Sequence, residues 1–129
     1  MKIKYIVVHC ADTPNDREVT AEEIHGWHLA NGWDGIGYHK VIGRSGLVEN
    51  GRPEYWQGSH VRGHNHESLG VCLVGRDSFT DDQWDSLFEL INLWKLQYPK
   101  AEVVGHCDLD SHKTCPNFDV KKWAKALGL

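Results

Sequence analysis

The sequence predicts a single α/β domain over residues 1–129, with a central mixed β-sheet flanked by helices. Two short apolar runs, residues 3–9 and 68–75, have the nearly continuous apolar character of strands buried on both faces. Segments with helical periodicity and N-terminal capping signals alternate with these runs, which is typical of helices packed on the faces of a sheet. A chain of 129 residues is long enough for one hydrophobic core and short for two.

The chain begins with a strand and a helix. Residues 3–9 form the first predicted strand, and the segment Cys10 to Glu18 is a loop with a turn signal. Thr20 and Glu23 have the spacing of a capping box. We therefore expect a helix over residues 21–31.

A glycine-rich segment and a hairpin follow. Residues 33–44 are expected to form a glycine-rich loop that leads into a strand. A turn at residues 43–46 then connects this strand to a partner strand at 47–49. Residues 51–65 combine aromatic, glycine and histidine residues without a sustained period. This pattern indicates a long surface loop of the kind that lines binding sites.

The C-terminal half is expected to contain two strands and two helices. The buried strand over residues 68–75 precedes an amphipathic helix that starts at Thr80, where Gln83 completes a capping box. A short strand at residues 101–104 follows, and Asp119 caps a closing helix.

Composition and charge exclude several classes of protein. The net charge is −4 and the Lys and Arg residues are scattered, which argues against a nucleic-acid partner. No apolar stretch is long enough for membrane insertion, and the N-terminal apolar run is too short for a signal peptide, so we expect the chain in the cytoplasm of the cell that makes it. The four cysteines are then expected as thiols, with Cys72 in the core.

Metal-ligating side chains are concentrated between residues 105 and 119. This stretch contains His106, Cys107, His112 and Cys115, beside the basic Lys113. Imidazole and thiolate groups at this density indicate a transition-metal site, with zinc as the expected ion.

The same residues allow two kinds of zinc site. His9 stands at the end of the first predicted strand and could join His106 and Cys115 in an open site with three protein ligands and one position for water. Alternatively, His106, Cys107, His112 and Cys115 could close a structural site and leave His9 unused. Spacing alone does not choose between them.

An open site would support hydrolysis. Zinc lowers the pKa of a bound water toward about 7 and polarises a carbonyl, which suits cleavage of an amide or ester. The tetrahedral oxyanion and the leaving group need further donors, for which Lys113 and Tyr38 are the candidates. His25 and His28, on the first predicted helix, are not expected to bind metal.

Several segments in one order resemble a known family. The chain is similar to the zinc-dependent N-acetylmuramoyl-L-alanine amidases of the bacteriophage T7 lysozyme type, which are related to peptidoglycan recognition proteins. The segments that resemble the family are IVVHC, IHGWH, GWDGIGYHKVI, GRPEYWQGSH, GHNHESLGVCLVG and KTCPNFD.

This resemblance implies an enzyme with one Zn²⁺ per chain. The metal ligands would be His9, His106 and Cys115, and Tyr38 and Lys113 would be the catalytic pair. The substrate would be peptidoglycan, cleaved at the amide between the lactyl group of N-acetylmuramic acid and the L-alanine of the stem peptide.

Two details of the site follow from the same resemblance. His60, Asn65 and His66 would belong to the substrate groove rather than to the metal site. The family pattern separates its final His and Cys by one residue fewer than His106 and Cys115, which makes His112 an alternative ligand. We favour His106 because it directly follows the predicted strand.

The runner-up function is a module that binds peptidoglycan without cutting it, or a regulatory partner protein with a structural zinc. Recognition proteins that do not cleave characteristically lack the cysteine ligand, whereas Cys115 is present here. The T7-type member also has a regulatory protein partner, for which this sequence offers no test. We expect a monomeric endolysin of a phage or prophage that accumulates in the host cytoplasm and reaches the wall after release.

Overall fold

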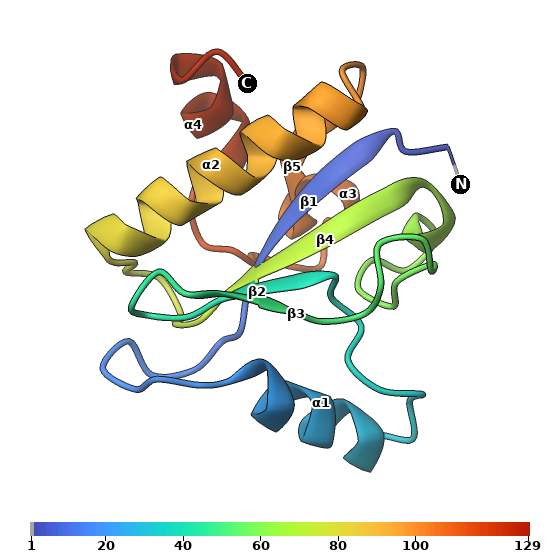
Figure 1. Ribbon diagram of the computed structural model, residues 1–129, viewed down its shortest axis with the longest axis vertical. Helices are drawn as coiled ribbons and strands as arrows, with labels where there is room; N and C mark the ends of the chain where they lie inside the picture. The colour runs from blue at the N-terminus through green and yellow to red at the C-terminus, as the bar shows by residue number, and fades with distance from the viewer. Residues whose placement is uncertain (1) are drawn as a thin grey trace.

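A five-stranded sheet forms the centre of the molecule (Figure 1). The computed structural model describes residues 2–129. The strand order is β3-β2-β4-β1-β5, and all neighbours are parallel except the antiparallel pair β2 and β3. The predicted mixed sheet is therefore confirmed. Its strands are β1 (Tyr5–Cys10), β2 (Lys40–Ile42), β3 (Val48–Asn50), β4 (Ser68–Leu73) and β5 (Glu102–Gly105).

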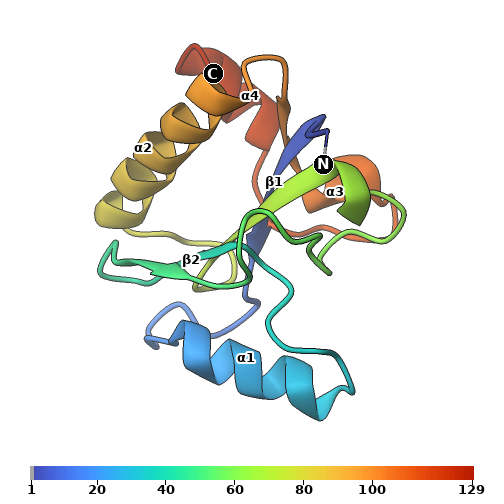
Figure 2. The same ribbon diagram turned by 45° about the vertical axis from the view of Figure 1, so that its right-hand side comes forward.

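Helices cover both faces of this sheet and make a three-layer domain. Figures 1 and 2 show α2 and α4 on one side and α1 on the other. The larger core cluster, which includes Ile6 and Val8 of β1, packs against α2 and α4. Val7, which alternates with them, points to the opposite face. The helices are α1 (Ala21–Ala30), α2 (Asp81–Gln97), α3 (His106–Leu109) and α4 (Val120–Ala126), with a 3₁₀ turn at Asn65–Glu67.

Capping boxes start the two longer helices, as the sequence predicts. The Glu23 amide donates to Thr20 Oγ1 at 3.1 Å, and the Thr20 amide donates to the Glu23 carboxylate at 2.9 Å. The same reciprocal pair joins Thr80 and Gln83 at 3.1 and 3.0 Å. Each box satisfies amide groups that have no partner within the first turn of a helix.

Gln83 also ties α2 to the sheet. Its side chain is fully buried, and Nε2 donates to the carbonyl oxygens of Ile42 and Val74 at 3.1 and 2.8 Å. Ile42 is the last residue of β2 and Val74 directly follows β4, so one amide group connects a helix with two strand ends. The sequence identified Gln83 only as a cap.

The segment after β5 differs from the predicted loop, because it begins with the short helix α3. The Gly105 amide donates to the Asp108 carboxylate at 2.8 Å, which stabilises this single turn. The long loop over residues 51–65 is confirmed, and strand limits shift by only one or two residues from those predicted.

The four cysteines are free thiols, as expected, and Cys72 is fully buried in the core. Among the described helices, none is both long and apolar enough to cross a bilayer.

Candidate metal centre and substrate groove

Three predicted ligands converge at one edge of the sheet. His9 is near the end of β1, and His106 directly follows β5. Because β1 and β5 are parallel neighbours, their carboxyl ends lie at the same edge. Cys115 reaches this edge from the loop after α3. One ligand atom from each of the three residues lies within 4.8 Å of the others.

The chemistry and spacing of these atoms fit zinc. Tetrahedral zinc has bonds of about 2.0–2.3 Å to imidazole and thiolate, which places its ligand atoms roughly 3.5 Å apart. Small side-chain rotations would close the observed group to that distance. Two imidazoles and one thiolate form a three-ligand set that leaves a fourth position open.

Both imidazoles are held in the neutral form that a metal requires. Burial, followed by the neighbouring His60 and His106, holds the pKa of His9 well below its usual value. Burial also lowers the pKa of His106. A neutral ring keeps a lone pair for coordination, so metal binding at these residues need not displace a proton at neutral pH.

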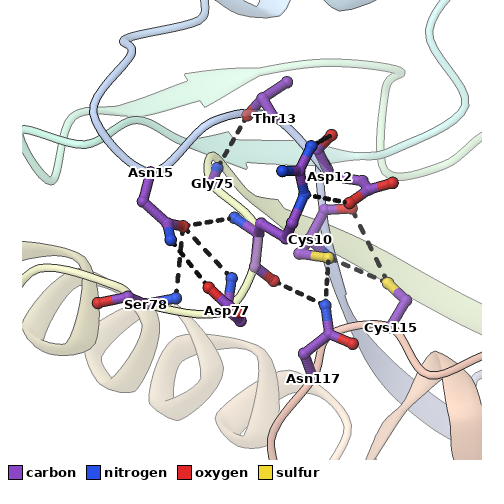
Figure 3. Close-up of polar contacts among 10 residues, drawn as sticks. Cys10, Asp12, Thr13, Asn15, Gly75, Asp77, Ser78, Cys115 and Asn117 are labelled. Atoms are coloured by element: carbon purple, nitrogen blue, oxygen red, sulfur yellow. Dashed lines mark hydrogen bonds and ion pairs between the residues drawn. The ribbon is translucent and has the colours of Figure 1, made fainter.

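Cys115 is fixed by backbone contacts from two sides, of which Figure 3 shows the one from Cys10. The Cys10 amide donates to its Sγ at 3.1 Å, and the Cys107 amide donates to its carbonyl oxygen at 2.9 Å. Hydrogen bonding to the Cys10 thiol, together with burial, raises the pKa of the Cys115 thiol in the metal-free chain. A bound cation would reverse this preference and release the thiol proton.

Side-chain hydrogen bonds join the loop of Cys115 to the loops that follow β1 and β4 (Figure 3). Asn117 Nδ2 donates to the Arg76 carbonyl oxygen at 2.8 Å. Arg76 Nε in turn donates to the Asp12 carboxylate at 2.8 Å, and the Arg76 amide donates to Asn15 Oδ1 at 2.9 Å. Three loops distant in sequence therefore position Cys115 as a unit.

His112 is placed away from this group. Its side chain is 92% exposed, and Nδ1 lies 3.4 Å from the Asp110 carboxylate. Neither His112 nor Cys107 belongs to the group of converging ligand atoms. The geometry thus favours the open three-residue arrangement over the local closed site.

Tyr38 borders the same group. Its ring lies 5.0 Å from the His9 ring, centroid to centroid, at the entrance to β2. Burial is the main cause that raises the pKa of Tyr38 well above its usual value. The hydroxyl consequently remains protonated at neutral pH and is available as a hydrogen-bond donor.

Three adjoining cavities form a groove beside the group. A cavity of about 390 Å³ contains His9, Tyr38 and Cys115 in its wall, together with His106 and Lys113. His106 and Lys113 also line the next cavity, of about 430 Å³. That cavity shares three lining residues with one of about 310 Å³: Trp33, Ser59 and Asn65.

The residues expected to bind substrate have different environments. His60 and Asn65 line the groove. Asn65 Oδ1 also accepts hydrogen bonds from the amides of His60 and Val61, both at 2.8 Å, and so shapes the loop. His66 is not among the residues that line these three cavities; its side chain is 65% exposed, 3.4 Å from the Glu67 carboxylate.

Other groove residues were not identified from the sequence. Trp33, Arg62 and Asp110 line the second cavity. Arg62 belongs to the loop that was expected to line a site, but the absence of periodicity in that loop gave no means to select individual positions.

His25 and His28 have a structural environment, consistent with the expectation that they do not bind metal. The amides of Ile36 and Gly37 donate to their Nδ1 atoms, both at 3.0 Å. The two rings thus anchor the glycine-rich segment that leads to Tyr38.

Comparisons with known proteins show similarity to amidases and endolysins. Residues 1–118 match the family described as N-acetylmuramoyl-L-alanine amidase. The chain is 40% identical to the endolysin of Enterobacteria phage K11 and 41% identical to that of Escherichia phage T7; each alignment covers 92% of this chain and 83% of the relative. Among solved structures, the endolysin N-acetylmuramoyl-L-alanine amidase LysCS from Clostridium intestinale matches with a TM-score of 0.89 and 30% identity, over 99% of this chain and 85% of that one.

Proposed function

The chain belongs to the N-acetylmuramoyl-L-alanine amidase family, and we propose that it is a zinc-dependent hydrolase of peptidoglycan whose catalytic domain comprises residues 1–129. It cleaves the amide between N-acetylmuramic acid and the L-alanine of the stem peptide. One observation supports this function above the others: His9, His106 and Cys115 converge in the wall of a cavity that Tyr38 and Lys113 also line. A closed structural site would have no such cavity at its ligands.

We assign the metal to His9, His106 and Cys115, one Zn²⁺ per chain. When bound, zinc supplies a Lewis acid that polarises the scissile carbonyl and lowers the pKa of water. The protein contributes neutral imidazoles and a thiol fixed by the Cys10 amide. These groups provide the charge and geometry of an open catalytic site.

Lys113 and Tyr38 supply the polar groups that amide hydrolysis requires. The Lys113 ammonium lies where two cavities meet, so it can stabilise negative charge on the carbonyl oxygen. The Tyr38 hydroxyl, which burial keeps protonated, can donate to the same oxygen or to the leaving nitrogen.

The groove provides the binding surface for the polymer. His60 and Asn65 line it and are assigned to substrate contact. His66 is exposed beside Glu67 and would contact only a part of the substrate that extends outside the groove.

The biological setting follows from the family. The chain acts as a monomeric endolysin that collects in the host cytoplasm and reaches the wall after release. The resemblance to the T7-type member also implies a regulatory protein partner. Light scattering of the purified chain tests the monomer directly.

The decisive experiment is mass spectrometry of purified peptidoglycan fragments after incubation with the protein, performed with zinc and with a chelator. We expect free stem peptides with an N-terminal L-alanine, lost on chelation and recovered when zinc is added. Fragments that bind without being cleaved, in a zinc-loaded preparation, would identify a recognition module instead.

Three variants test the residue assignments. Cys115→Ser should lose zinc and activity, whereas Cys107→Ser changes a thiol in the same segment but outside the ligand group and should retain both. Lys113→Ala should retain zinc and lose activity. Retention of zinc and full activity by Cys115→Ser, or of full activity by Lys113→Ala, would refute the corresponding assignment.

A further inference from the structure

His60 is hydrogen-bonded to the proposed metal ligand His9. His9 Nε2 and His60 Nδ1 are 2.8 Å apart, and the two rings meet edge to face with centroids 5.0 Å apart. On its other side, His60 Nε2 lies 3.2 Å from Ser68 Oγ. Ser68 Oγ donates to the His64 carbonyl oxygen at 2.8 Å. Four residues therefore form one continuous chain of hydrogen bonds.

The direction of every bond in this chain is set at the Ser68 end. A carbonyl oxygen only accepts, so the single hydroxyl proton of Ser68 must point to His64. Ser68 Oγ can then only accept from His60, which places the ring proton of His60 on Nε2. Within the described part of the chain the His60 ring bonds to His9 and Ser68 and to no carboxylate that would stabilise a protonated imidazole, so the ring is neutral and its Nδ1 has a lone pair.

The same argument fixes the tautomer of His9. Because His60 Nδ1 accepts, His9 Nε2 must carry the proton and donate. The neutral His9 ring then has its only free lone pair on Nδ1. That lone pair is the one available to a metal at the group of His9, His106 and Cys115.

We propose that His60 is a positioning residue for the metal centre, which selects the Nε2–H tautomer of His9 and aims its Nδ1 at the zinc. This inference rests on the proposed zinc site and adds to His60 a role other than substrate contact. Partners of this kind, which bond to the second nitrogen of a ligating histidine, orient the ring and raise metal affinity.

The surroundings of His60 support this role. A Cβ at Gly70 would lie 2.6 Å from His60 Nδ1, and one at Gly58 would lie 2.7 Å from Cδ2 of the same ring. The His60 amide is also held by Asn65 Oδ1 at 2.8 Å. Two glycines and one amide side chain thus create a slot that presents the ring to His9.

Two substitutions at His60 distinguish the role of its Nδ1 from that of its Nε2. In His60→Asn the amide oxygen can occupy the place of Nδ1 and still accept from His9. In His60→Gln the longer side chain carries its polar atoms toward Ser68 and places methylene groups beside His9. Zinc affinity is measured for both by competition with a chromophoric chelator, and thermal unfolding of the metal-free proteins confirms that each is folded.

We expect His60→Asn to bind zinc within about threefold of the original protein and His60→Gln to bind about 10–100-fold more weakly. Equal affinity of all three proteins would overturn the proposal, as would an equal loss in both variants, which would assign the effect to the ring as a whole.

The tautomer itself is read from long-range ¹H–¹⁵N correlation spectra of the unsubstituted, metal-free protein. His9 with its proton on Nε2 and His60 with its proton on Nε2 are expected, and His9 protonated on Nδ1 refutes the inference even if a variant fails to fold. Absence of any zinc binding by the unsubstituted protein would instead refute the proposed function.

Discussion

Replacement of Gln83 by Met should destabilise the domain without changing the metal site. The substitution keeps the volume of a fully buried side chain but removes three hydrogen bonds, to the Ile42 and Val74 carbonyls and from the Thr80 amide. Each such bond contributes about 1 kcal/mol net, so the free energy of unfolding should fall by roughly 3 kcal/mol.

The cost is limited because both carbonyl oxygens keep another partner. The Val74 amide donates to the Ile42 carbonyl at 2.9 Å, and Arg44 Nη1 donates to the Val74 carbonyl at 3.2 Å. Neither group is left without a hydrogen bond, so the larger penalty of an unsatisfied buried carbonyl does not apply.

Urea unfolding of the metal-free protein measures the change. The matched control is Gln97→Met on the same helix, where the side chain is exposed and, among residues 2–129, bonds only to the Tyr98 hydroxyl at 3.3 Å. We expect the control to change stability by less than about 0.5 kcal/mol. A Gln83→Met protein as stable as the control would refute the view that this amide fastens α2 to the sheet.

Three further substitutions test the pH response and the packing of the fold. Burial lowers the pKa of His39, and its Nδ1 accepts a hydrogen bond from the Gly70 amide at 3.0 Å. Below about pH 6.5, His39 of the unfolded chain therefore takes up a proton that the native ring does not take up. The free energy of unfolding should therefore fall with decreasing pH. In denaturant titrations at several pH values, His39→Gln should reduce this dependence by up to about 1.4 kcal/mol per pH unit. An unchanged pH dependence would contradict the assignment. Gly37→Ala places a Cβ onto the Ser59 carbonyl oxygen and should lower both the melting temperature and the activity, whereas Gly26→Ala on α1 meets no atom within 4 Å and should raise stability by about 0.5–1 kcal/mol.

The sequence predicted those parts of the fold that depend on local signals. The capping pairs at Thr20 and Thr80 located the starts of α1 and α2 because they act within one helical turn. The short helix α3 was missed because its single turn is stabilised by one carboxylate, Asp108, in a stretch whose composition indicated a ligand-rich loop.

Residue types and spacing left two arrangements of the candidate site open, and the family resemblance favoured the one made by His9, His106 and Cys115. Density of His and Cys near the C-terminus indicated a metal, yet spacing could not choose between His106 and His112. That choice depends on β5 lying beside β1, which is a long-range pairing. The contact between His60 and His9 has the same origin: it joins the long loop over residues 51–65 to strand β1, and no local pattern predicts it.

The distribution of the ligands along the chain has a consequence for biosynthesis. His9 is made 97 residues before His106 and 106 residues before Cys115. A growing polypeptide therefore has an incomplete metal centre until translation has passed Cys115 and that residue has left the ribosome. Ion capture would then close a loop of about a hundred residues, so that loading with zinc is a late event that adds stability to a completed fold.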